Sequence, residues 1–126
     1  MALRRNVISQ KWNYLAVKWA YYKYINASGK INESSYNRSA SSYTENLMLL
    51  KAGTYNIHGF NSYTGTSGIN YRIHEYNANG KWIKQVDNVS VPNNSAVDFT
   101  FVLDHDAYIR ISLAILYFTG TLTKVS

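Results

Sequence analysis

The chain of 126 residues predicts a single domain that is large enough to bury a core of its own. It has no cysteine, which excludes disulfides, zinc ribbons and thiol catalysis, and its aromatic residues are spread along the whole chain, which indicates a folded domain. The net charge of +6 arises in residues 1–51, which hold eight of the thirteen Lys and Arg against two Glu. These basic residues are spaced singly, so a nucleic-acid partner is the weaker alternative to a solvated surface.

The N-terminal segment carries two arginines without the apolar stretch of a signal peptide, and the most apolar run, residues 111–118, is too short to span a bilayer. We therefore expect a soluble protein that folds in a cytosol and has no membrane partner, which also suits the missing cysteines. If it acts outside a cell, a larger assembly carries it there. Residues 12–19 fit either a strand or a helical stripe, and residues 1–20 are either an edge strand or a linker.

Short segments rich in β-branched and aromatic residues alternate with Gly, Asn and Ser turns, which predicts an all-β sandwich or barrel. The first hairpin is expected from residues 21–25 and 31–35, joined by a turn with Gly at its bend. Residues 43–50 and 54–60 are the next strands, and a loop with Tyr63 at its middle follows them. The remaining strands are expected at residues 69–77, 81–86, 97–104 and 108–118.

Side chains of a strand alternate between two faces, so each predicted strand can be sorted into an apolar and a polar side. The apolar sides are expected to form the core, with Tyr55, Ile57, Tyr71, Ile73, Phe99, Phe101, Ile109, Ile111 and Leu113. The polar sides collect a second set, with Asn56, His58, Asn70, Arg72, His74, Tyr108, Arg110 and Ser112. A solvated sheet face is the simple explanation of the second set.

The composition of the polar set favours a binding face over simple solvation. Ordinary solvated strands are rich in Lys, Glu and Thr, whereas this set is rich in planar Arg, His, Asn and Tyr side chains, which fix a polar ligand in one orientation. Aromatic rings beside them cover the C–H face of a sugar. The predicted carbohydrate contacts are Asn56, His58, Tyr63, Asn70, Arg72, His74, Trp82 and Arg110.

Other chemistry finds less support in the sequence. His58 and His74 share the polar side by parity, which leaves a two-histidine metal site as an alternative that lacks a third ligand. Residues 104–106, Asp-His-Asp, are expected to cap a turn, with a structural Ca²⁺ as the less favoured alternative. No spacing places two carboxylates together on the polar side, and no P-loop or nucleophile elbow is present. We expect no catalytic activity and no cofactor.

Four motifs occur in order along residues 21–113. They are Asn-x-Ser-Gly-Lys-Ile at 26–31, Lys-x-Gly-Thr-Tyr at 51–55, Tyr-Asn-x-Asn-Gly-Lys-aromatic-Ile at 76–83 and Ala-Tyr-Ile-Arg-Ile-Ser at 107–112. Their order and spacing resemble the carbohydrate-binding modules of tail and baseplate proteins from phages that infect Gram-positive bacteria, such as evolved distal tail proteins and accessory baseplate proteins. The chain departs from that pattern at Ala52, where the family often has proline, and its loop 61–68 has no counterpart there.

The resemblance implies a jelly-roll-like antiparallel β-sandwich spanning residues 1–126. It also implies a lectin-like adhesion module of the virion, made in the host cytoplasm, assembled with other tail or baseplate subunits, and used for host recognition and attachment. Its ligand would be a bacterial cell-wall polysaccharide or related saccharide, and the positive charge would favour anionic polymers. Two alternatives stay open, namely a structural virion module without a glycan ligand and a nucleic-acid-binding β domain.

Overall fold

The structure is a computed structural model that describes residues 10–11, 19–21, 23–33, 42–65 and 69–126. Its regular structure consists of antiparallel strands and one 3-10 turn, η3 (Ile115–Tyr117), which confirms the all-β prediction. These residues contain no helix that is long and apolar enough to cross a membrane. Most of residues 12–19, whose conformation the sequence left open, lie outside the described part.

The strands form two sheets and one separate hairpin. Sheet A lies in the order β1 (Gln10–Lys11), β12 (Phe118–Lys124), β7 (Gly53–Asn61) and β10 (Ser95–Leu103). Sheet B lies in the order β2 (Trp19–Tyr21), β5 (Ser42–Thr44), β11 (Ala107–Leu113), β8 (Ile69–Tyr76) and β9 (Trp82–Val91), with β6 (Met48–Leu50) also paired to β11. The hairpin consists of β3 (Lys23–Ile25) and β4 (Ile31–Glu33).

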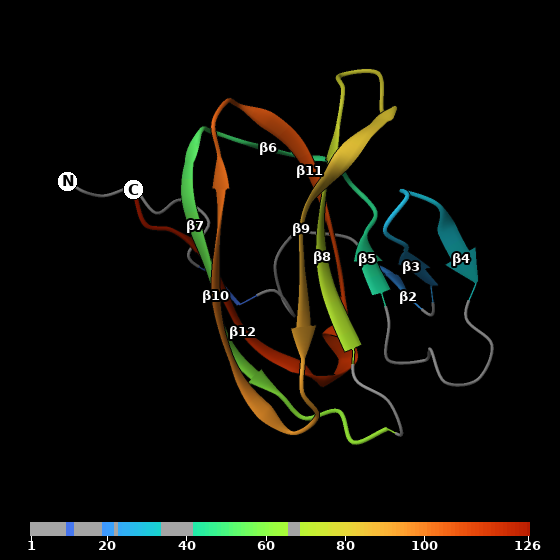
Figure 1. Cartoon of the computed structure of the whole chain (residues 1–126), viewed down its shortest axis with the longest axis vertical. Coiled ribbons are helices and arrows are strands. Elements are labelled where there is room, and N and C mark those ends of the chain that lie inside the picture. The colour runs from blue at the N-terminus through green and yellow to red at the C-terminus, as the bar shows by residue number, and fades with distance from the viewer. Residues whose placement is uncertain (1–9, 12–18, 22, 34–41, 66–68) are drawn as a thin grey trace.

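The order of the strands is that of a jelly roll. From β5 onward the chain passes repeatedly between the sheets, so that β7, β10 and β12 lie in sheet A while β8, β9 and β11 lie in sheet B. With β1 at one edge of sheet A and β5 and β6 beside β11 in sheet B, each layer receives the strands that a double Greek key assigns to it. The two layers face each other across the core (Figure 1).

The core fills the space between the two sheets, as strand alternation predicts. Eight of the nine expected core residues belong to the buried apolar cluster, and Phe99 packs against it half-buried. Aromatic rings from both sheets meet there, because Tyr71 of sheet B and Phe118 of sheet A lie edge to face with centroids 5.6 Å apart. Each fully buried side chain of this size stabilises the fold by about 1.5–3 kcal/mol.

Three of the predicted strands are wrong in detail. The strand expected at residues 81–86 continues to Val91 as β9. The expected strand 43–50 is two short strands, β5 and β6, both paired to β11. The expected strand 108–118 ends at Leu113, because Ala114 leaves the extended conformation with φ −87° and ψ 72° and begins η3. The chain then forms β12, a central strand of sheet A that was not expected at all.

A pair of glycines explains both the course of β12 and its absence from the prediction. Gly120 lies opposite Gly59 of β7, and a Cβ atom at either position would overlap the backbone of the other strand. The two strands therefore approach so closely only because both residues lack a side chain. In the sequence, the Thr-Gly-Thr of β12 is weak evidence for a strand, since Gly marks turns more often than strand interiors.

The β3–β4 hairpin forms a third layer on the outside of sheet B (Figure 1). Ile25 is fully buried, and its backbone N–H donates to Ser112 Oγ of β11 at 3.2 Å. The turn between the two strands brings Gly29, with φ +86°, against the indole ring of Trp82 at the start of β9. The hairpin is therefore docked onto the polar side of sheet B, and we call it the docked hairpin.

Candidate functional site

The predicted contact residues are divided among three places. Asn56 and His58 lie on β7, and the alternate residues Tyr55 and Ile57 are in the core, so both polar side chains point outward from sheet A. Asn70, Arg72, His74 and Arg110 alternate with core residues of β8 and β11, and they point outward from sheet B. Tyr63 lies in the loop after β7.

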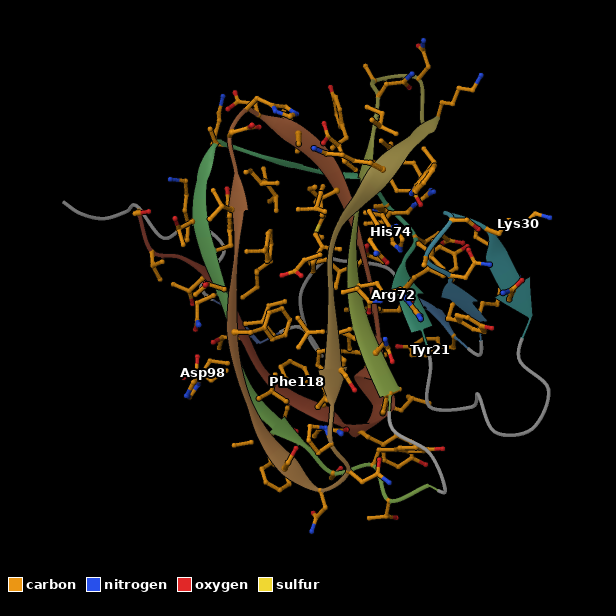
Figure 2. The ribbon with its side chains drawn as sticks, in the orientation of Figure 1. Tyr21, Lys30, Arg72, His74, Asp98 and Phe118 are labelled. Carbon is orange, nitrogen blue, oxygen red and sulfur yellow. The ribbon has the colours of Figure 1, made fainter. Side chains whose placement is uncertain are left out.

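The expectation of a single polar face is therefore wrong. Parity tells whether a side chain points toward the core, but β7 and β8 belong to different sheets whose core sides face each other. Their polar sides consequently lie on opposite surfaces of the sandwich, as the labels of Asp98 and of Arg72 and His74 show in Figure 2. The two-histidine metal site is excluded for the same reason, because His58 and His74 lie on these opposite surfaces.

His74 is fully buried beneath the docked hairpin, so the expected solvent-exposed imidazole is also wrong. Its Nδ1 accepts a hydrogen bond from the indole N–H of Trp82 at 3.1 Å, which places the ring proton on Nε2. Burial is the largest cause that lowers the pKa of His74 to about 4, while the backbone of Ile25 opposes this shift and Arg72 adds to it. The imidazole is thus neutral at pH 7 and links β8, β9 and the docked hairpin.

Trp82 and Arg110 also serve the packing of sheet B. The indole of Trp82 is half-buried and carries Gly29 of the docked hairpin against its ring. The Arg110 guanidinium donates to the Glu45 carbonyl oxygen through Nε at 3.2 Å and Nη2 at 2.9 Å, and it lies 4.9 Å from the centroid of the Tyr76 ring. Both side chains hold neighbouring segments together, so the presence of Trp and Arg at these two positions is explained without a ligand.

Asn70 and Arg72 also lie on the outer surface of sheet B, on β8. Asn70 Nδ2 donates to Asn88 Oδ1 of β9 at 2.8 Å. Arg72 is half-buried, and burial lowers the pKa of its guanidinium, which a nearby tyrosine, Tyr24, partly offsets. Its Nε atom is buried and has no hydrogen-bond acceptor.

Tyr63 lies at the end of the sandwich where several loops meet. Its ring packs edge to face against Tyr117 of η3, with centroids 5.3 Å apart, and its carbonyl accepts from Asn94 N at 3.0 Å. Asn61, fully buried, fixes this end by donating to Pro92 O at 3.0 Å and accepting from Tyr63 N at 3.2 Å. Tyr63 is therefore part of the packing of this loop end and does not lie on a strand of either polar sheet surface.

The outer surface of sheet A, which we call the sheet-A face, carries exposed polar side chains that none of the described segments covers. The pairing of β12, β7 and β10 places Thr121, His58 and Asp98 in one row and Thr123, Asn56 and Thr100 in the next. His58, Asp98 and Thr100 are exposed. Phe60 follows on the same side of β7 and is 44 % exposed. None of the described side chains on these rows is Lys or Arg.

One hydrogen bond pre-orients the polar groups of the sheet-A face. Asn56 Nδ2 donates to Asp98 Oδ1 at 2.9 Å and to the Phe99 carbonyl oxygen at 3.2 Å. The second carboxylate oxygen of Asp98 and the amide oxygen of Asn56 are then directed acceptors, with the His58 imidazole beside them and Phe60 as an aromatic plate. Sequence reasoning missed Asp98, because its proximity to His58 depends on the pairing of β7 with the distant strand β10. It also missed Phe60, although strand alternation alone places this ring on the same side of β7 as His58.

The turn at residues 104–106 forms hydrogen bonds with other residues of the chain. Asp106 accepts from Ala52 N at 2.9 Å and from Lys51 Nζ at 3.3 Å, as a turn cap does. The His105 ring bonds Asp104 through Nδ1 and the buried Glu75 through Nε2, and the bond to Glu75 is the largest cause that raises the pKa of His105. Among the residues that the structure describes, no group of three or more His, Asp or Glu side chains could hold a metal ion.

Comparisons with known proteins leave the fold and this geometry as the basis for any functional inference. No family model matches the chain, and no curated protein and no solved structure is similar to it. The class that the strands define is a jelly-roll β-sandwich with one open polar sheet face and one sheet face covered by a hairpin.

Proposed function

We propose that this chain is a non-catalytic saccharide-binding module and that the sheet-A face is its binding surface. The observation that supports this most is the Asn56–Asp98 pair, held at 2.9 Å beside His58 and the exposed ring of Phe60. A carboxylate and an amide that are already bonded to each other hold their remaining oxygens in place, so these oxygens accept from vicinal hydroxyls with little loss of conformational entropy. A neighbouring flat ring covers the apolar C–H face of the same sugar.

The biological setting that we propose is an adhesion module of a phage tail or baseplate that binds a host cell-wall polysaccharide. This rests on the resemblance of four sequence motifs, and the jelly-roll strand order is the fold that the resemblance implies. One shallow site of this kind binds with a dissociation constant of about 10⁻⁶ to 10⁻³ M. Many copies on a symmetric virion would raise the apparent affinity by about 10²- to 10⁴-fold.

The test is binding of the fluorescently tagged chain to whole Gram-positive cells, with purified cell-wall polysaccharide as the competitor. We expect surface labelling that the polysaccharide displaces and that 0.5 M sodium chloride leaves largely intact, because the sheet-A face binds through neutral hydroxyl contacts. Labelling that no polysaccharide displaces, or no labelling of any strain in a broad panel, would refute the proposal.

The second candidate function is docking to another virion subunit. The loop end of the sandwich favours it, because Leu116 is 49 % exposed and the neighbouring Tyr117 is 37 % exposed, which gives two exposed apolar side chains in a row. A nucleic-acid ligand is less compatible with the sheet-A face, since its described rows contain Asp98 and no Lys or Arg. Co-purification of the chain with tail subunits, lost on Leu116→Ser and kept on Asp98→Asn, would favour docking.

A further inference from the structure

We propose a second ligand site, specific for an oxyanion such as a phosphate or carboxylate group, at Arg72 beside the docked hairpin. This site lies on the outer side of sheet B, opposite the sheet-A face (Figure 2). It does not depend on the proposed saccharide site, although an acidic polysaccharide would carry groups that suit it.

Arg72 carries a charge that is not paired with any carboxylate whose side chain the structure describes. The side chain is half-buried, its Nε has no exposed surface and no hydrogen-bond acceptor, and no carboxylate of the described residues forms an ion pair with it. Two of the described titratable groups interact electrostatically with Arg72, namely the Tyr24 phenol and the buried, neutral imidazole of His74. Shielded polar groups in folded proteins nearly always have a hydrogen-bond partner, so the Nε–H of Arg72 calls for an acceptor, and a guanidinium favours an anionic one.

The neighbours of Arg72 supply donors. In the register of sheet B, Arg72 lies between Ser112 of β11 and the exposed Asn88 of β9. Asn88 accepts a hydrogen bond from Asn70 with its Oδ1, which leaves the amide N–H group of Asn88 to donate. The Asp87 carboxylate next to it already accepts from the Asn88 backbone N–H at 2.8 Å. A guanidinium next to an amide donor binds an oxyanion by charge-assisted and often bidentate hydrogen bonds.

The long-range field of the chain favours the same ligand class. The formal net charge of the protein is +6, and the docked hairpin carries Lys23 and Lys30 against Glu33. A positive field of this kind raises the local concentration of anions and their rate of association. The field does not raise the local concentration of neutral sugars. The charge of a ligand therefore distinguishes ligands of the Arg72 site from ligands of the sheet-A face.

The test follows the Arg72 Nε–H signal in ¹H–¹⁵N spectra of the full chain. Sodium phosphate, glycerol phosphate and glucuronate are titrated separately against sodium chloride of equal ionic strength. We expect saturable shifts of the Arg72 Nε–H and Asn88 side-chain signals with an oxyanion and not with chloride. Binding of glycerol phosphate as well as inorganic phosphate would assign the site to groups carried on a polymer, and binding of inorganic phosphate alone would assign it to the free ion.

A matched pair of variants makes the test decisive. Asn88→Asp places a carboxylate next to Arg72, so it should weaken phosphate binding about tenfold or more. Asn79→Asp makes the same change of charge in the exposed β8–β9 turn and should leave binding unchanged. If phosphate does not shift the Arg72 Nε–H signal, or if the two variants bind phosphate equally well, the proposed site is refuted. Phe60→Ala should keep the phosphate response, which separates this result from the fate of the saccharide site.

Discussion

Acid should loosen the docked hairpin through His74, and the size of the effect follows from the burial of the imidazole. The pKa of His74 is lowered from 6.5 to about 4. Because the folded state binds the proton less tightly than the unfolded chain, the stabilisation is fully present above pH 6.5. It is lost as the pH falls from about 6.5 to about 4. A difference of 2.5 units corresponds to about 3 kcal/mol of unfolding free energy over this range.

Protonation has a structural cost that agrees with this sign. The Nδ1 atom of His74 accepts from the Trp82 indole N–H, so a proton on Nδ1 sets two donors against each other. The turn of the docked hairpin rests on the same indole through Gly29. The hairpin is therefore expected to lose protection from hydrogen exchange before the two sheets do.

His74→Gln isolates this contribution from all other titrating groups. The glutamine amide can still accept from the Trp82 indole with its oxygen, but it does not titrate. Urea unfolding at pH 7, 5.5 and 4 gives the free energy of unfolding for both proteins. We expect the variant to be less stable at pH 7 and the gap to shrink by about 3 kcal/mol at pH 4. Parallel loss of stability in the two proteins would refute the assignment of the buried neutral imidazole.

Two further predictions concern the docked hairpin and the 104–106 turn. Gly29→Ala and Gly80→Ala both place alanine at a positive φ, +86° and +82°, which costs about 1–2 kcal/mol, but only the former also meets the Trp82 ring. Gly29→Ala should therefore be the less stable by at least about 1 kcal/mol in urea unfolding, and equal losses would contradict docking on Trp82. The pKa of His105 should exceed 6.5 in NMR titration and fall on Glu75→Gln. The stabilisation by His105 is present below pH 6.5 and is lost as the pH rises through this raised pKa. A His105 pKa unchanged by Glu75→Gln would show that their hydrogen bond does not form.

The sequence predicted the core and the turns because both depend on local patterns. Alternation placed Tyr71 and Ile73 inside, and both are fully buried. The two Asn-Ala-x-Gly-Lys turns, at residues 26–30 and 77–81, form the same pair of backbone hydrogen bonds around their Gly, so this short motif determines its own conformation.

The assignment of strands to sheets could not be predicted from local patterns. Parity grouped His58 with His74, whereas their sheets depend on how β7 and β8 pair with strands far away in the chain. The planar Arg, His and Asn side chains on the polar side of β8 did indicate a contact surface, but the surface packs against the docked hairpin. Side chains such as His74 and Arg110 bond strand neighbours and overlying segments at once, which Lys or Glu would not do as well. Nothing local in the sequence indicated that residues 23–33 would cover this surface.

The measurement that tests the central claim most directly compares Phe60→Ala with Val102→Ala in the cell-labelling assay. Both residues point outward from sheet A and are exposed, Phe60 by 44 % and Val102 by 63 %, so neither change should lower the melting temperature appreciably. The account predicts that Phe60→Ala weakens polysaccharide binding about tenfold, through the lost aromatic plate, while Val102→Ala binds like the wild type. Unchanged binding by Phe60→Ala would contradict the account.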